Sequence, residues 1–237
     1  MPIQALSALH ESASLSGVAG ALLRPGGFLL TERGISHCRF SPEALIVDVG
    51  CGTGASVDYL RQQHHFRAVG FDLSEDLLWR SSRAGYLPLA QANATDLPVV
   101  TGACDGILCE CVLSLVSEPQ RAVSEFVRVL RSGGYLVMSD LYDRCQENSQ
   151  RTHFTECGSP LRTRAVLESL VLDAGFDLLV WEDHTRYLRE LAAQLVLSQD
   201  SPADFCALFA VSGSGCSGSS SVAFPRPGYF LMVAQKK

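Results

Sequence analysis

Residues 47–54, VDVGCGTG, constrain the fold of this chain more than any other segment. A short apolar run ends here in Gly50, Gly52 and Gly54, and a helical pattern follows at once. A strand that turns sharply into a helix presents free backbone N–H groups and the positive end of the helix dipole, and glycine lets a ligand approach the main chain closely. The segment therefore predicts a ligand-binding loop between a buried strand and a helix.

The alternation of apolar runs with helical patterns continues along the chain. The predicted strands cover residues 44–50, 66–74, 106–113 and 133–140. The predicted helices cover residues 54–65, 75–85 and 118–134, and glycine closes the last two, as it often closes helices. Strands that alternate with helices indicate a mostly parallel sheet with helices on both faces.

The regular alternation of strands and helices changes in the second half of the chain. We expect a helix over residues 165–176, a strand over 177–183 and a closing strand over 228–237. The insert before the closing strand has a helical pattern at 185–197 and a serine- and glycine-rich run at 212–221, which predicts a mobile connection.

Composition excludes several classes of protein. The chain has 237 residues and a formal net charge of -6, without any basic run, which argues against a nucleic-acid or anionic-membrane partner. No apolar stretch reaches the roughly 18 residues of a membrane span, and the first residues lack a leader pattern, so we expect a cytoplasmic protein. Nine cysteines without a C-x-x-C pair predict neither a metal site nor a disulfide scaffold.

Two cofactor classes use such a glycine loop. Gly50, Gly52 and Ala55 satisfy the dinucleotide spacing G-x-G-x-x-G/A, and Asp72 lies near the position of a ribose-binding acid. Asp48, however, would face a diphosphate, and like charges ~4 Å apart cost about 4 kcal/mol at an effective dielectric constant near 20. The same carboxylate favours a ligand with an ammonium and a sulfonium, such as S-adenosylmethionine, over a nicotinamide dinucleotide.

Five segments in order resemble the class I S-adenosylmethionine-dependent methyltransferases: VDVGCGTG, FDLS, ANATDLPV, CDGILCECVLSLV and RSGGYLVMSDLYD. The final GYFLMVAQ is similar to the family's antiparallel seventh strand. The resemblance implies an α/β fold with a doubly wound, Rossmann-like, seven-stranded, mostly parallel sheet and an antiparallel last strand. It implies one methyltransferase domain over residues 1–237, with an N-terminal helical cap (1–43), a core (44–183), an insert or lid (184–227) and a closing strand (228–237).

The resemblance also implies how S-adenosylmethionine would be held. Residues 48–54 would line its methionine and ribose, and Asp72 would accept hydrogen bonds from both ribose hydroxyls. Leu73 would pack on the adenine, with Asn93, or alternatively Asp96, as acceptor for the adenine amine. The cofactor-binding residues implied in this way are Asp48, Gly50, Cys51, Gly52, Thr53, Gly54, Asp72, Leu73, Asn93, Ala94, Cys109 and Glu110.

Simpler explanations exist for the same residues. The three glycines would also permit a tight turn without any ligand. Asp72 would also cap a helix that begins at Ser74, and Asn93 is a common turn residue. The histidines at 64 and 65 suit a structural role at a helix C-terminus.

Candidate acceptor residues follow the fourth and fifth strands of the implied sheet, because ligands gather at the carboxyl ends of parallel strands. Glu110 and Cys111 should border the transferable methyl group, and Asp140 and Tyr142 should face the acceptor. Glu110 or Asp140 can serve as a general base for a hydroxyl or amine, although alignment alone is sufficient for a soft nucleophile.

Residues 133–183 have a narrower resemblance, to arsenite methyltransferases. Cys157 occupies the position of a cysteine that helps that family bind trivalent arsenic. The helix after the glycine loop lacks the cysteine that the family also uses, so a soft or thiol acceptor is an alternative.

The segment before the first strand contains Pro25 and two glycines, followed by Thr31 as the expected helix start. We hypothesise that Gly27, Thr31 and Arg33 help to close the site, with Arg33 near the substrate. The leading prediction is a cytoplasmic enzyme that methylates a small molecule. The alternatives are a non-catalytic module that binds S-adenosylmethionine or S-adenosylhomocysteine, and an NAD(P)-dependent oxidoreductase.

Overall fold

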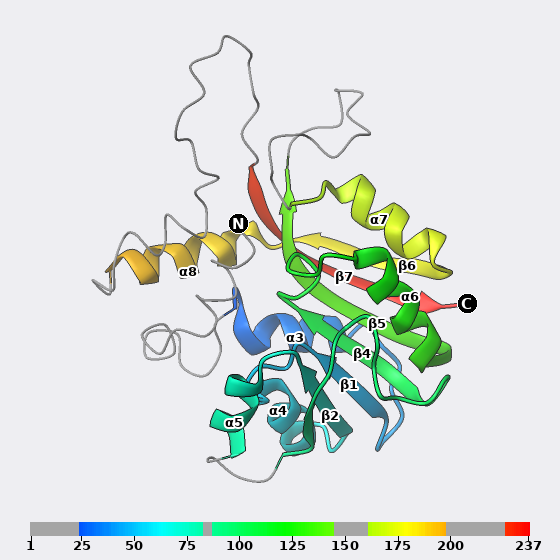
Figure 1. Cartoon of the computed structure of the whole chain (residues 1–237). Coiled ribbons are helices and arrows are strands. Elements are labelled where there is room, and N and C mark those ends of the chain that lie inside the picture. Colours follow the sequence, from blue (N-terminus) through cyan, green and yellow to red (C-terminus); the bar gives the residue numbers. More distant parts are fainter. Residues whose placement is uncertain (1–23, 83–86, 145–160, 198–225) are drawn as a thin grey trace.

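The computed structural model describes residues 24–82, 87–144, 161–197 and 226–237, which contain one seven-stranded sheet with helices on both faces (Figure 1). Its strands are β1 (Leu45–Val49), β2 (Arg67–Asp72), β3 (Leu89–Gln91), β4 (Cys104–Glu110), β5 (Leu130–Asp143), β6 (Phe176–Asp183) and β7 (Pro227–Lys236). Their order is β3-β2-β1-β4-β5-β7-β6. Strand β7 runs antiparallel to both of its neighbours, and the other neighbouring pairs are parallel. The predicted fold class is confirmed.

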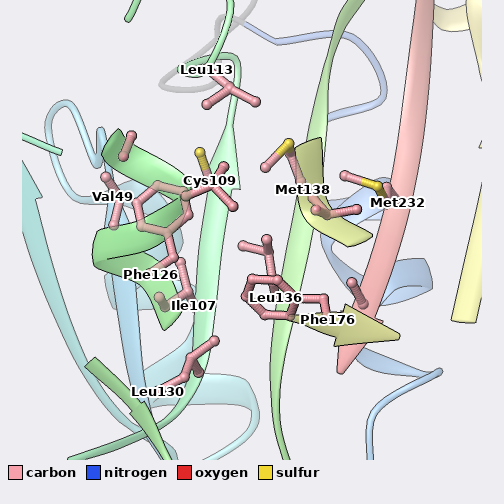
Figure 2. Packing of buried hydrophobic residues seen from close by; sticks show 14 of the residues in the cluster. Val49, Ile107, Cys109, Leu113, Phe126, Leu130, Leu136, Met138, Phe176 and Met232 are labelled. Carbon is pink, nitrogen blue, oxygen red and sulfur yellow. The ribbon is translucent and has the colours of Figure 1, made fainter. Parts of the chain in front are cut away.

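Two groups of helices cover the sheet. The helices are α3 (Gly27–Ile35), α4 (Ala55–Gln63), α5 (Glu75–Ser82), α6 (Pro119–Val129), α7 (Arg164–Asp173) and α8 (Thr185–Leu197). Helices α6 and α7 bury apolar side chains such as Phe126 and Leu167 in one core cluster (Figure 2). On the other face, α4 packs Val57 and Leu60 against Leu108 of the sheet. The two faces of each central strand are therefore both buried, as expected for a parallel sheet between two helical layers.

The strand register decides which face each polar side chain occupies, because successive side chains of a strand alternate. Asp48 pairs with Leu108, and Glu110 pairs with Ser139, so all four belong to the face covered by α3 and α4. Asp140 follows Ser139 and belongs to the opposite face. Glu110 and Asp140, the two acids predicted as alternative general bases, therefore leave the sheet in opposite directions.

Three predictions about element boundaries are corrected by the structure. The helix expected over residues 118–134 ends at Val129, and the next five residues belong to β5. Leu130 pairs with Cys104, after which the register shifts. A Cβ at Gly134 would lie 3.0 Å from the carbonyl oxygens of Arg131 and Asp105, so this glycine permits close backbone contact inside a strand and does not close a helix.

The N-terminal cap also differs from its prediction. Helix α3 begins at Gly27, so Thr31 is not a helix start but a fully buried residue inside the helix. A Cβ at Gly34 would lie 2.3 Å from Cγ1 of Val137, which shows how closely α3 lies against β5. Strand β3 is the third difference, because the sequence pattern predicts no strand over residues 89–91. The predicted mobile run at 212–221 lies outside the described residues.

Candidate active site

The glycine loop between β1 and α4 has three residues with positive φ: Gly50 (73°), Gly52 (55°) and Gly54 (82°). A Cβ at Gly50 would lie 2.1 Å from Cγ2 of Val112, and one at Gly54 would lie 2.8 Å from Cδ1 of Leu89. A Cβ at Gly52 would meet nothing within 4 Å. Gly50 and Gly54 therefore hold the loop against its neighbours, whereas Gly52 faces open space that a ligand can occupy.

Asp72 at the end of β2 holds the middle of this loop. Its Oδ2 accepts a hydrogen bond of 2.7 Å from the N–H of Gly52, and its Oδ1 accepts one of 2.8 Å from the N–H of Ser74. Helix α5 begins at Glu75, and the hydroxyl of Ser74 accepts from the N–H of Leu77 at 3.4 Å, so Ser74 caps the helix and Asp72 holds the turn before it. Each carboxylate oxygen has two lone pairs, so both oxygens can accept a further hydrogen bond, and this turn does not exclude a ligand.

Asp48 at the end of β1 is buried, with 3% of its surface exposed. Burial, and secondarily the nearby charge of Glu110, raises the pKa of Asp48 to about 8, although Arg24 opposes this shift. The carboxyl group is therefore mostly protonated at neutral pH, which changes the argument made from the sequence. A cation bound beside Asp48 would lower its pKa and favour ionisation, while an anion would raise it. A cationic ligand beside Asp48 would therefore be expected to bind with release of the proton of that carboxyl group.

Glu110 lies at the centre of a buried hydrogen-bond network on the same face. Its Oε2 lies 2.9 Å from Nη2 of Arg24, and its Oε1 accepts a hydrogen bond of 3.0 Å from the hydroxyl of Thr31. Arg24 also donates to the hydroxyl of Ser56 at 2.9 Å, at the start of α4. Burial raises the pKa of Glu110, while Arg24 and Thr31 lower it. The network joins the N-terminal segment, the end of β4 and the glycine loop's helix.

Sequence reasoning missed Arg24, which belongs to none of the segments that carry the resemblance. The only available signal was a basic residue directly before Pro25 in the segment expected to close the site. The buried Thr31 was named, and the structure brings it to Glu110. Gly27, named with it, has a positive φ of 49° at the first position of α3.

Cys111 follows Glu110 in a backbone conformation that is rare for a residue with a side chain, with φ at 59°. Its thiol lies 3.0 Å from the hydroxyl of Tyr229, which in turn lies 3.1 Å from the hydroxyl of Ser139. Burial raises the pKa of Cys111 to about 12. At neutral pH the thiol is therefore protonated, which disfavours Cys111 as a thiolate ligand for a soft acceptor.

The residues expected around an adenine lie at the ends of β2 and β3. Leu73 is 66% exposed, which is unusual for a leucine beside a buried strand end and suits a residue that would cover an aromatic ring. The Oδ1 of Asn93 accepts hydrogen bonds of 3.0 Å from both the N–H and the hydroxyl of Thr95. Asn93 therefore forms a turn, the simpler explanation considered for it, and its carbonyl oxygen is already shared.

The structure places several other predicted residues away from an open site. Tyr142 is buried in the core on the α6–α7 face and donates its hydroxyl to Asp183, so it does not face an acceptor on the side of Glu110. Cys109 lies in the same core. A Cβ at Gly70 would lie only 2.7 Å from the sulfur of Cys51, so this thiol packs tightly against β2. Both cysteines thus pack through their side chains, and only their main chain is left for a ligand.

Two further predicted residues lie outside the network. The guanidinium of Arg33 is about half exposed and pairs with Glu182 of β6 at 2.6 Å, so it points to the surface and not to Glu110. Cys157 lies outside the described residues. Asp140 accepts hydrogen bonds from the N–H groups of Ser114 (2.8 Å) and Leu141 (2.7 Å), and thereby holds the loop after β4.

Within the described ranges, no group of three or more His, Cys, Asp or Glu side chains is placed to hold a metal ion. Across the same ranges, no helix has the length and apolar character that crossing a membrane requires.

Comparisons with known proteins agree with this geometry. Residues 47–138 match the methyltransferase domain family. The chain is 29% identical over 149 residues to "O-methyltransferase resE" of Aspergillus sclerotiorum, and 27% identical over 164 residues to a sarcosine/dimethylglycine N-methyltransferase of Halorhodospira halochloris. These matches cover 58% and 63% of this chain but only 56% and 57% of the relatives, so the chain spans just over half of their length.

A solved structure shows the same fold. The geranyl diphosphate C-methyltransferase of Streptomyces coelicolor, in complex with Mg²⁺, geranyl diphosphate and S-adenosyl-L-homocysteine, superimposes with a TM-score of 0.70 at 17% identity. The likeness covers 88% of this chain and 79% of that one. The matched residues contain the glycine loop, Asp72, Asn93 and Glu110. Residues 47–138 therefore resemble the methyltransferase domain family, and the described fold is similar to that of a solved methyltransferase.

Proposed function

We propose that this protein transfers the methyl group of S-adenosylmethionine to a small-molecule acceptor. The observation that carries the proposal is the glycine loop, in which a Cβ at Gly52 would meet nothing within 4 Å while the N–H of Gly52 is held by Asp72 at the end of the adjacent strand. The match of residues 47–138 to the methyltransferase domain family supports the same function. Three similar proteins act, by their names, on oxygen, nitrogen and carbon, so similarity favours the reaction class and leaves the acceptor atom open.

The residues at the loop fit the cofactor. Asp72 has spare lone pairs for two ribose hydroxyls, and the exposed Leu73 offers an apolar surface for the adenine. Asp48 provides a buried acid for the cationic methionine end. The main-chain atoms of Cys51, Thr53, Gly54, Ala94 and Cys109 would complete the contacts, together with Asn93 if its turn opens.

When bound, S-adenosylmethionine supplies an electrophilic methyl group. The chain would then contribute mainly by holding and aligning, which is worth roughly 7–11 kcal/mol of the barrier in favourable cases. Glu110 is held in place by Arg24 and Thr31, and would orient the methionine end more than accept a proton. Asp140 is the other proposed base, but both of its oxygens already accept backbone hydrogen bonds. Alignment without a dedicated base therefore fits this chain better.

The wider parts of the proposal come from the sequence. We propose one methyltransferase domain over residues 1–237, in which the N-terminal cap and the insert shape the acceptor pocket. A cytoplasmic location stays a prediction. The arsenite alternative stays a prediction, because Cys157, the residue that carries it, lies outside the described residues.

Calorimetric titration of the full chain with S-adenosylmethionine, S-adenosylhomocysteine and NADH tests the proposal. We expect saturable binding of the first two and none of NADH. Labelled S-adenosylmethionine is then incubated with a panel of hydroxyl, amine, thiol and carboxylate acceptors, and labelled product is expected from at least one. Tight cofactor binding without transfer to any acceptor in a broad panel would favour the non-catalytic module, and NADH binding would favour the oxidoreductase.

A further inference from the structure

Three residues other than glycine have a positive φ within the ranges that the structure describes: Glu43, His65 and Cys111. Glu43 and His65 are exposed in the loops that lead into β1 and β2, at the amino ends of those strands. Cys111 differs, because it directly follows β4 at the carboxyl edge and its side chain is partly buried. A left-handed conformation is strained for a residue with a Cβ, and such strain collects at functional sites. The conformation of Cys111 therefore points to a role at this edge beyond closing a turn.

Two hydrogen bonds hold Cys111 in this conformation. Its N–H donates to the carbonyl of Ser139 at 2.7 Å, and its thiol lies 3.0 Å from the hydroxyl of Tyr229. That hydroxyl lies 3.1 Å from the hydroxyl of Ser139, the residue that pairs with Glu110 on the neighbouring strand. Tyr229 therefore contacts both the residue that follows Glu110 in the chain and the residue that lies beside it in the sheet.

Tyr229 itself is held from several sides. Its side chain is fully buried and packs against Leu30 of α3 and Leu188 of α8. Its N–H donates to the hydroxyl of Thr185 at 3.2 Å, and its carbonyl accepts from the N–H of His184 at 2.7 Å, where α8 begins. Because both the ring and the main chain are held, the hydroxyl has a defined position and can orient the thiol that it binds.

The turn at Cys111 decides where its two neighbours in the chain lie. On one side, Val112 packs so closely against the glycine loop that a Cβ at Gly50 would lie 2.1 Å from its Cγ2. On the other side lies the buried carboxylate of Glu110, whose charge acts on Asp48 beside the same loop. A change in the backbone of Cys111 would therefore move Val112 and Glu110 together relative to the proposed cofactor loop.

We propose that Tyr229 is a positioning residue for methyl transfer: its hydroxyl holds Cys111 in the left-handed turn that keeps Glu110 beside the methyl-bearing sulfur of S-adenosylmethionine. The inference rests on the proposed function, and it adds a side chain of β7 that lies 118 residues further along the chain than Cys111. S-Adenosylmethionine differs from S-adenosylhomocysteine by one methyl group and one positive charge. A carboxylate held near the sulfur favours the cationic form, so misplacing Glu110 lowers the affinity for S-adenosylmethionine relative to that for S-adenosylhomocysteine.

The ratio of these two affinities tests the proposal without a known acceptor, and calorimetric titration of the full chain measures both. In Tyr229→Phe, we expect the affinity for S-adenosylmethionine to fall about fivefold, as follows from losing one hydrogen bond. The affinity for S-adenosylhomocysteine should stay within about twofold. Tyr142→Phe is the matched control, because Tyr142 is also buried and its hydroxyl also binds another side chain, but it lies in the core on the opposite face of the sheet.

Substitutions of Cys111 separate positioning from a loss of packing at Tyr229. Cys111→Ala removes the thiol and should lower the affinity ratio as much as Tyr229→Phe does. The double variant should be no worse than either single variant, because both changes break the same contact. Cys111→Ser keeps a hydrogen-bonding group for Tyr229, so its ratio should stay within about twofold of that of the unaltered chain. A ratio as low in Cys111→Ser as in Cys111→Ala would assign the effect to the sulfur itself and overturn the role of the hydrogen bond.

The outcomes also separate this inference from the proposed function. An unchanged ratio in Tyr229→Phe, or an equal fall in Tyr142→Phe, would overturn the positioning role, while binding of both nucleosides to the unaltered chain would leave the methyltransferase proposal standing. A hydroxyl with a purely structural role would lower the melting temperature of both variants and change the ratio in neither. If the unaltered chain binds neither nucleoside, the proposed function fails, and this inference fails with it.

Discussion

The two ends of the sheet's carboxyl edge are built in different ways. At β1 and β2, the contact between Gly52 and Asp72 spans 20 residues and joins adjacent strands, and the glycine loop itself encodes its positive φ angles. At β5, β6 and β7, the same edge is held by contacts that span more of the chain, 41 residues for Tyr142 with Asp183 and 83 for Asp143 with Arg226. A short motif therefore predicts the proposed cofactor end, whereas the end at β5, β6 and β7 depends on the register of distant strands.

Gly50→Ala should have the largest effect of the variants considered, and it tests the glycine loop at β1 and β2. The new Cβ would combine a positive φ with a 2.1 Å approach to Val112, so we expect a loss of about 3 kcal/mol of unfolding free energy and no measurable cofactor binding. Urea denaturation and calorimetry measure the two effects. Gly175→Ala is the control, because Gly175 has a φ of 104° but open space around its Cβ position. An equal loss of unfolding free energy in Gly50→Ala and Gly175→Ala would show that the close approach to Val112 does not constrain the loop.

Substitution of one acid at each part of the sheet edge, Asp72 at β2 and Asp140 on β5, should have smaller and different effects. Asp72→Asn should weaken S-adenosylmethionine binding by about tenfold to a hundredfold, because an amide keeps one acceptor oxygen instead of two. Asp140→Asn should leave cofactor affinity within about twofold and instead lower unfolding free energy by roughly 1–2 kcal/mol, since one of its two backbone contacts is lost. Cofactor affinity that falls equally in both variants would show that the two ends are not independent.

The same difference explains what sequence reasoning could and could not predict. Strands β1, β2 and β4 follow from apolar runs, and the glycine loop with Asp72 follows from spacing. Strand β3 has only three residues, two of them exposed, so it carries no periodic signal. Arg24 has no local pattern, and only the packing of α3 against β5 brings it to Glu110.

Tyr142 was assigned to the acceptor because it lies near a strand end. A shift of one residue along a strand reverses the face, so strand-end position alone cannot say which layer receives a side chain. The end of α6 was misplaced for a related reason: Gly133 and Gly134 resemble a helix C-terminus but accommodate an irregular start of β5.

The protonation of Asp48 should make the free energy of unfolding depend on pH. The pKa of Asp48 is raised to about 8, so between about pH 4 and pH 8 the folded chain holds a proton that the unfolded chain has lost. The contribution of Asp48 to the free energy of unfolding is thus fully present below about pH 4, and it falls as the pH rises from about 4 to about 8.

Cofactor binding should report the same group. A cationic cofactor lowers the pKa of Asp48, so binding of S-adenosylmethionine at pH 7 should release up to about one proton. Calorimetry at one pH in two buffers of different ionisation enthalpy measures this number. Asp48→Asn should abolish most of the release, and an unchanged release would assign the proton to another group.

The smallest expected effect concerns Arg33, for which the sequence and the structure predict opposite results. If Arg33 closes the site, Arg33→Ala should weaken cofactor or acceptor binding. Its guanidinium instead pairs with Glu182 at an exposed surface, where ion pairs contribute little because water and salt screen them. We therefore expect cofactor affinity within about twofold of the unaltered chain, with Arg39→Ala, another exposed arginine, as the reference. A tenfold fall in affinity for Arg33→Ala alone would mean that α3 moves when the ligand binds, and that the site includes the surface that Arg33 now shares with β6.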